Sequence, residues 1–189
     1  MNPIIKWPGG KSREIDKIQH LIPKYKRYVE PFFGGGAVFF HLAPKSAAIN
    51  DISESLIEYY KLVKDQDKQL YDLLVCYNNS FNNIVSVCEK NTSELLQLFF
   101  KLKDGVIQKQ ELSIQLEELI ASLSDKINSG FSEKLLLDKD VFDSFLHQMV
   151  EDKFIRTVSN YNKKPFSTEN LCENLITGFT SGYYMYFRK

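Results

Sequence analysis

The stretch Tyr28-Val-Glu-Pro-Phe-Phe-Gly-Gly-Gly36, followed by the apolar run Ala37 to Leu42, decides the fold of the N-terminal part of the chain. Tyr28 to Glu30 is a β-prone run that stops at Pro31 and three glycines, and the residues after the glycines favour a helix. The order predicts a strand, a tight turn and a helix. Consecutive glycines let the backbone approach a ligand closely, and the free amides at the start of the helix favour a carboxylate or phosphate.

A second strand and helix follow directly. Ala47-Ala-Ile-Asn-Asp51 is predicted to be a strand, and Ser53 is predicted to cap a helix that runs through Val63. Two such units in succession imply a parallel sheet. An acidic residue in the position of Asp51 accepts hydrogen bonds from ribose hydroxyls in nucleotide-binding α/β sheets, and the alternative role for its carboxylate is to cap the helix.

Two common phosphate-binding motifs are excluded by counting residues. A dinucleotide fingerprint needs a glycine three residues after Gly36, where this chain has Phe39. A P-loop ending in Gly10-Lys11-Ser12 needs a glycine five residues before Gly10, where the chain has Ile5.

Residues 67–150 carry helical patterns only. Their apolar residues recur at helical spacing, and breaks fall near Asp104-Gly105 and at Asn128-Ser-Gly130. We interpret the stretch as a helical insertion whose apolar stripes cover its own core, with a partner-binding coiled coil as the alternative.

Composition favours one domain, because the chain has 189 residues of which 43% are hydrophobic. It has no apolar run of 18 residues, and Pro3, Lys6 and Pro8 interrupt the stretch that a signal peptide would need, so we expect a soluble cytoplasmic protein without membrane contact. No CxxC spacing suggests a metal site, and we expect free, buried structural thiols at Cys76, Cys88 and Cys172. We assign no catalytic role to His20, His41 or His147.

The net charge of zero conceals an uneven distribution of charge. Residues 1–45 contain eight Lys or Arg and three Asp or Glu, residues 153–189 contain six and two, and residues 46–152 contain ten and nineteen. Basic ends suggest where phosphate groups would meet the surface, although solvated helix faces explain the same counts.

Recognition of a family rests on three motifs taken in order. Ile4-Ile-Lys-Trp-Pro-Gly-Gly-Lys11, Tyr28 to Gly36 and Asn50-Asp51-Ile52 resemble the first three motifs of the DNA adenine methylase family, of the D12 class. The segment Ser181 to Arg188 resembles a family helix that precedes the DNA-recognition region. A small-molecule or RNA methyltransferase with the same cofactor fold is a further alternative.

The resemblance implies an α/β fold: a Rossmann-like core that binds S-adenosyl-L-methionine, with an incomplete parallel sheet. Residues 1–66 and 151–189 would form the core, and residues 67–150 the insertion. By motif position, Trp7 and Lys11 would line the methionine end of the cofactor, the turn from Glu30 to Gly36 would approach it, and Asp51 with Ile52 would hold ribose and adenine. The complete set of implied cofactor-binding residues is Trp7, Pro8, Gly9, Gly10, Lys11, Glu30, Pro31, Phe32, Phe33, Gly34, Gly36, Asp51 and Ile52.

The sequence departs from the family in its catalytic motif. Family members use an Asp-Pro-Pro-Tyr tetrapeptide to steady the target amine and stack on the flipped base, whereas no two of the six prolines in this chain are adjacent. No residue is therefore assigned as catalytic, and none as a metal ligand. We expect that double-stranded DNA is the partner of the complete enzyme, and that a second chain with the missing motif, or self-association, covers the open sheet. The alternative is a catalytically silent binding module or the remnant of a truncated gene.

Overall fold

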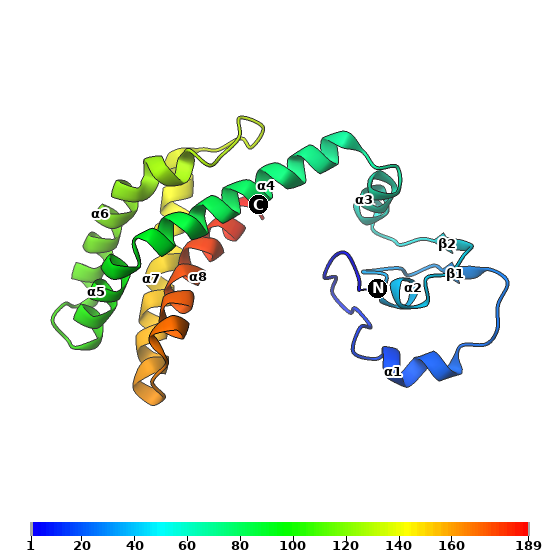
Figure 1. Cartoon of the computed structure of the whole chain (residues 1–189), viewed down its shortest axis with the longest axis horizontal. Helices are drawn as coiled ribbons and strands as arrows, with labels where there is room; N and C mark the ends of the chain where they lie inside the picture. The colour runs from blue at the N-terminus through cyan, green and yellow to red at the C-terminus, as the bar shows by residue number, and fades with distance from the viewer. Residues whose placement is uncertain (1, 189) are drawn as a thin grey trace. The chain divides into compact units, whose positions relative to one another are not determined.

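The computed structural model describes residues 2–188 and divides into two compact units near residue 70 (Figure 1). The N-terminal unit, blue to cyan in Figure 1, contains α1 (Ile15–Ile18), the short 3-10 helix η1 (Gln19–Leu21), β1 (Tyr28–Glu30), α2 (Ala37–Leu42), β2 (Ala47–Ile49) and α3 (Glu54–Lys64). The second unit is helical and contains most of α4 (Lys68–Lys90), followed by α5 (Thr92–Lys103), α6 (Lys109–Asn128), α7 (Lys139–Lys163) and α8 (Thr168–Phe187).

The two strands form a parallel sheet, as the successive strand and helix units predicted. Tyr28 is opposite Ala47, and Glu30 is opposite Ile49. The second strand is two residues shorter than predicted, because the chain turns after Ile49 to bond across the end of the sheet. The Asn50 amide donates to the Glu30 carbonyl at 2.9 Å, and the Asn50 carbonyl accepts from the Phe33 amide at 2.9 Å.

The hydrophobic core of the N-terminal unit is small. Phe33, Leu56 and Tyr60 are buried, and the rings of Phe33 and Tyr60 pack edge to face with centroids 4.8 Å apart. The predicted Ser53 cap is confirmed, since its side chain accepts a hydrogen bond from the Leu56 amide. This cap fixes the start of α3 and brings its buried face over the sheet.

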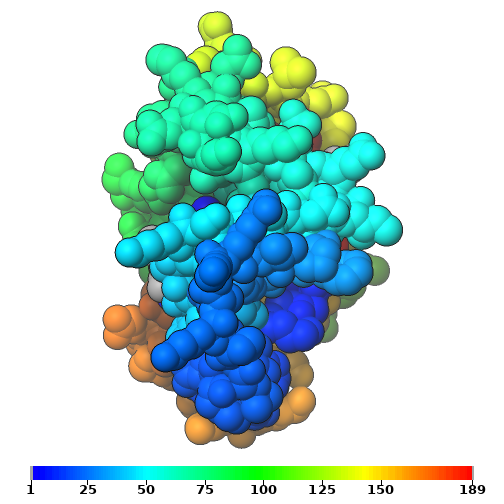
Figure 2. All heavy atoms as spheres, turned by 90° about the vertical axis from the view of Figure 1, so that its right-hand side faces the viewer, coloured from blue at the N-terminus to red at the C-terminus, as the bar shows by residue number. Residues whose placement is uncertain are grey.

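The loop before β1 lies on the outside of this unit. Residues 23–27 are all exposed, and Figure 2 shows this stretch in bright blue standing out from the surface. Lys24, Lys26 and Arg27 give the loop a positive charge without an acidic neighbour in the same stretch. The basic character predicted for the N-terminal part is therefore available to solvent.

The second unit has a continuous apolar core, and its helices follow the predicted pattern. The breaks predicted near 104–105 and 128–130 are confirmed by the ends of α5 and α6. The predicted stripes of α6 and α7 supply buried side chains to this core, namely Leu112, Leu116, Ile120, Leu123, Ile127, Phe142, Leu146 and Val150. The stripes thus cover the core of their own unit.

Helices α7 and α8 approach each other closely through two glycines of α8. A Cβ atom on Gly182 would lie 2.9 Å from the Leu146 Cα, and one on Gly178 would lie 3.0 Å from the Val150 Cα. Only hydrogen at these positions allows the backbones to come this near. At the residue after Gly182, the Tyr183 hydroxyl hydrogen-bonds the buried Ser80 hydroxyl of α4 at 2.9 Å and connects α4 to this pair of helices.

The compact units differ from the predicted division of the chain. Helix α7 continues through the predicted boundary at 150/151, and residues 151–189 cluster with the preceding helices. Among residues 2–188 the fold is mostly helical with a two-stranded sheet, so a complete Rossmann-like sheet is not present in this part of the chain. None of the helices in residues 2–188 is both long and apolar enough to cross a membrane.

We predict that Gly182→Ala destabilises the helical unit by about 1–3 kcal/mol, because the added methyl group meets the backbone of α7. The cost of this overlap is larger than the free energy gained from the higher helix propensity of alanine. Urea unfolding followed by circular dichroism at 222 nm measures the change. Ser181→Ala, one residue earlier on α8, is the control and should change stability far less. Equal stability of Gly182→Ala and the wild type would contradict the close-packing argument.

Candidate functional site

The glycine turn after β1 adopts backbone conformations that favour glycine. Gly34 and Gly36 have φ angles of 53° and 69°, in the left-handed region. A Cβ on Gly36 would also overlap the ring of Phe33, which is only 3% exposed. The turn is therefore packed against the Phe33 ring on one side.

The Asp51 carboxylate closes the turn from the end of the second strand. Its Oδ2 accepts a hydrogen bond from the Gly34 amide at 2.8 Å, and its Oδ1 accepts from the Ser53 amide at 3.1 Å. These bonds, first the one from Gly34 and then the one from Ser53, lower the pKa of Asp51. The residue is thus anionic at neutral pH, and each of its oxygens keeps a lone pair for a further donor.

The loop around Trp7 packs against the same turn. A Cβ on Gly34 would lie 3.2 Å from Trp7 Cδ1, and one on Gly35 would lie 3.0 Å from the Ile5 carbonyl oxygen. The loop itself is a tight turn, in which the Gly10 amide donates to the Trp7 carbonyl at 3.1 Å. Three segments that are distant in sequence therefore meet at the glycine turn.

Exposed apolar side chains flank this meeting point. Phe32 is 83% exposed and Ile52 is 92% exposed, and each follows the end of one of the two parallel strands. Large exposed apolar groups at the carboxyl edge of a sheet offer surface to a flat apolar ligand. Phe33, by contrast, is buried in the core, so its contribution within this structure is structural.

Glu30 lies at the last position of β1 and is half-buried. The Tyr28 hydroxyl donates to its Oε2 at 2.8 Å. Burial raises the pKa of Glu30, and the bond from Tyr28 opposes that rise. The pair orients the Glu30 carboxylate at the start of the turn.

The structure brings together the three segments that contain the predicted cofactor residues. These are Trp7, Pro8, Gly9, Gly10 and Lys11 in the first segment, Glu30, Pro31, Phe32, Phe33, Gly34 and Gly36 in the second, and Asp51 and Ile52 in the third. The side chain of Lys11 bonds within its own loop, where its Nζ donates to the Gly9 carbonyl at 3.0 Å.

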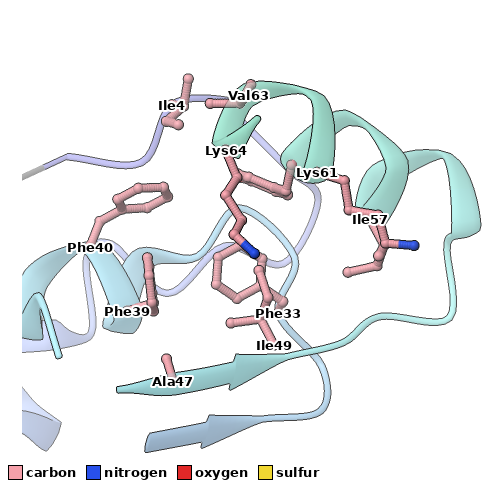
Figure 3. Close-up of a pocket in the computed structure, with 11 residues that line it drawn as sticks. Ile4, Phe33, Phe39, Phe40, Ala47, Ile49, Ile57, Lys61, Val63 and Lys64 are labelled. Carbon is pink, nitrogen blue, oxygen red and sulfur yellow. The ribbon is translucent and has the colours of Figure 1, made fainter. Parts of the chain in front are cut away.

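Cavities open on the described part of the N-terminal unit, and two of them bear on the site. The first, of about 430 Å³, lies between the sheet, α2 and α3, and Figure 3 shows Phe39 and Phe40 on one side of it and Lys61 and Lys64, from α3, on the other. Of the predicted cofactor residues it contains only Phe33. Its lining is largely apolar and does not include the Asp51 carboxylate, so the chemistry of the three motifs lies elsewhere.

The second cavity, of about 550 Å³, lies beside Trp7 and Gly35. Its lining includes Lys6 of the first motif, and also Ser12 and Arg13, for which the sequence predicted no role. Lys6 was part of the quoted first motif, but the position of Arg13 on the same cavity has no regular spacing that would have identified it. This cavity has the size of a small-molecule site.

The histidines and cysteines have structural surroundings. His147 bridges α7 to the Ser113 carbonyl of α6 at 2.9 Å, His41 lies 3.2 Å from the Gln19 side chain, and His20 is exposed. The three cysteines are free, as predicted, but the expectation that they are buried holds only for Cys88, since Cys76 and Cys172 are half-buried. Within residues 2–188 no three His, Cys, Asp or Glu side chains are arranged to hold a metal ion.

The motifs and their arrangement define a class of methyltransferase. The family model for D12 class N6 adenine-specific DNA methyltransferases matches residues 7–174, and the chain belongs to this family.

Among curated relatives, the chain is 49% identical over 110 residues to the type II methyltransferase M1.LlaDCHI of Lactococcus lactis subsp. cremoris, covering 58% of this chain and 36% of the relative. It is 34% identical over 114 residues to the type II methyltransferase M.MjaIII of Methanocaldococcus jannaschii, covering 55% of this chain and 37% of the relative. It is 35% identical over 79 residues to the DNA N-6-adenine-methyltransferase of Escherichia phage P1, covering 42% of this chain and 10% of that protein. The chain thus spans little more than a third of the first two relatives.

We predict that Asp51→Asn removes an acid-sensitive part of the stability of the N-terminal unit. Because the folded-state pKa of Asp51 is lowered, its contribution is present above the ordinary carboxyl pKa of 3.8 and disappears as the pH falls through the folded value. The stability difference between wild type and variant should therefore be constant near neutrality and shrink below about pH 4.

Fluorescence of Trp7, the single tryptophan, reports unfolding of this unit in urea. Asp65→Asn is the matched control and should show no comparable difference at neutral pH. A difference between wild type and Asp51→Asn that persists unchanged at pH 2.5 would contradict the assignment.

Proposed function

We propose that this chain is the S-adenosylmethionine-binding part of a site-specific DNA adenine methyltransferase, with β1 and β2 as the first two strands of a Rossmann-like sheet. The observation that supports it most directly is the 2.8 Å hydrogen bond from the Gly34 amide to Asp51, which joins the second and third motifs. The Trp7 loop packs on the same glycines. The three motifs therefore have the proximity that binding one small molecule requires.

In this proposal each segment contacts a different part of the cofactor. The free lone pairs of Asp51 accept hydrogen bonds from the ribose hydroxyls. Ile52 and Phe32, which are largely exposed, pack on the adenine ring. The glycines of the turn have no side chains and allow close approach of the backbone to the cofactor, and Trp7 borders the methionine end.

When bound, the cofactor supplies an electrophilic methyl group. The residues of this chain bind and orient it, and the acceptor is the exocyclic amine of an adenine taken out of the DNA stack. Because this sequence contains no Asp-Pro-Pro-Tyr, we propose that residues outside it hold the target base. The exposed basic loop 23–27 is suited to contact phosphates of the double-stranded DNA.

A restriction-modification role is part of the same proposal. Two of the relatives are named type II methyltransferases, and we extend that setting to this chain. The alternative is a silent binding module that keeps the cofactor site without turnover, and the missing tetrapeptide favours it. The two functions differ in whether a complementing catalytic segment restores methyl transfer.

We predict that residues 1–189 bind S-adenosylmethionine weakly in a calorimetric titration, and that Ile52→Ala weakens binding by about tenfold, because truncation removes apolar surface from the adenine ring. Ile52 is 92% exposed, so its loss leaves folding intact. Leu21→Ala, also in an exposed position of this unit, is the control and should bind like the wild type. Equal affinities of the wild type and Ile52→Ala would reject this adenine contact.

We also predict that residues 1–189 alone transfer no radiolabelled methyl group to duplex DNA, since no group in the chain matches the tetrapeptide that steadies the target amine. Addition of the Asp-Pro-Pro-Tyr half of a family member should restore transfer, and Asp51→Asn should reduce the restored rate at least tenfold. Turnover by residues 1–189 alone would overturn the prediction. Cofactor binding without any restored transfer would favour the silent module.

A further inference from the structure

The cavity between the sheet, α2 and α3 is an apolar space in a unit whose own core is small. Among the described residues of this unit, Phe33, Leu56 and Tyr60 form the buried hydrophobic cluster. The cavity has a volume of about 430 Å³, and apolar side chains from the segment of Ile4, the sheet and both helices line most of it. A cavity of about 150 Å³ already accommodates one benzene ring. The space is therefore large enough for more than one large apolar side chain.

One polar atom in the wall of this cavity is buried without a partner. Tyr60 is 7% exposed and lines the cavity, and its hydroxyl oxygen forms no hydrogen bond within residues 2–188. Burial, with a smaller contribution from Tyr59, raises the pKa of Tyr60 to about 12, so the hydroxyl keeps its proton at neutral pH. A buried donor without an acceptor destabilises a fold. An occupant of the cavity that brings an acceptor removes this cost.

Two cations lie on the α3 side of the same cavity (Figure 3). Lys61 and Lys64 both line it, and neither forms an ion pair or a side-chain hydrogen bond within the part of the chain that the structure describes. Both residues are exposed. Their ammonium groups are therefore available to a carboxylate of whatever enters the cavity.

We propose that the protein segment with the Asp-Pro-Pro-Tyr motif docks on the N-terminal unit through this cavity. It inserts large apolar side chains between α2 and α3, accepts a hydrogen bond from the Tyr60 hydroxyl, and places an acidic residue beside Lys61 and Lys64. This inference rests on the proposed function, in which such a segment completes the enzyme. It adds the surface and the chemistry by which the segment is held.

The size of the core indicates that the occupant is protein. The N-terminal unit extends to Leu70, and a polypeptide of this length with so few buried residues gains little stability from its own apolar contacts. A small molecule in the cavity would add few such contacts, whereas a polypeptide segment extends the core over the sheet. The chain spans little more than a third of the first two relatives, which have further chain to supply this segment.

The test measures by sedimentation velocity how tightly the Asp-Pro-Pro-Tyr half of a family member binds the full chain at low salt. Tyr60→Phe should weaken binding about fivefold, because it keeps the ring and removes the donor. The same variant should not destabilise the free chain in urea, since the hydroxyl has no partner there. Lys64→Glu should weaken binding at least tenfold. Tyr25→Phe and Lys45→Glu, which are exposed and outside the cavity, are the matched controls and should bind like the wild type.

The outcomes separate this inference from the proposed function. Equal affinities of the wild type, Tyr60→Phe and Lys64→Glu would overturn the docking surface, and so would a wild type that does not associate with the half, even if it binds S-adenosylmethionine. A free Tyr60→Phe chain that is less stable than the wild type would count against it, because the hydroxyl would then have a partner within the chain. If the wild type self-associates and Tyr60→Phe weakens that association, a second copy fills the cavity and the choice of occupant is wrong. If the half binds as expected but the complex does not bind S-adenosylmethionine, the proposed function fails and the docking surface stands.

Discussion

The hydrogen bond between the Gly34 amide and the Asp51 carboxylate holds the end of the first strand and turn to the end of the second. The sheet has only two strands of three residues each, and the buried core of the unit is small. A sheet of this size does not define the position of its loops by packing alone. The site geometry therefore depends on backbone groups bonded across the sheet end, with Asp51 as the charged acceptor among them.

The glycines give this arrangement its shape. At Gly34 a side chain would approach the indole of Trp7, and at Gly36 it would overlap Phe33. The turn is thus compressed between a loop above and a core ring below, and both glycines have positive φ angles. These glycines consequently allow the Trp7 loop and the Phe33 ring to pack on the turn from two sides.

Local chemistry explains which parts of the fold the sequence predicted. The strand from Tyr28 to Glu30 and the helix from Ala37 to Leu42 have the predicted bounds, because proline and glycine punctuate them within a few residues. The Ser53 cap is local in the same way. The predicted boundary at 150/151 has no counterpart among the helix ends, since α7 continues through it. Whether residues 151–189 belong to the cofactor core of a longer protein stays a prediction.

The candidate site was predictable to a similar extent and for a similar reason. The three motifs were visible as short segments, and the structure brings them together. The cavity with Arg13 was not visible, because it depends on how the Trp7 loop folds back on Gly35 and not on spacing. The close approach of α7 to α8 at Gly178 and Gly182 was likewise not predicted from the sequence, because it depends on which helix packs against these glycines.

Ligand binding and stability of the N-terminal unit are linked through these contacts. In the proposed mode a cofactor bridges Asp51, the glycine turn and the Trp7 loop, which are the contacts that fix the unit in its folded form. A ligand that binds only the folded form stabilises it. Once the ligand concentration exceeds the dissociation constant, this stabilisation grows with the logarithm of the concentration. Because the unit has little core, part of the binding free energy orders these loops, and the measured affinity is lower than the contacts alone would give. Any further segment that covers the sheet would order the same loops in advance and raise the affinity without touching the cofactor.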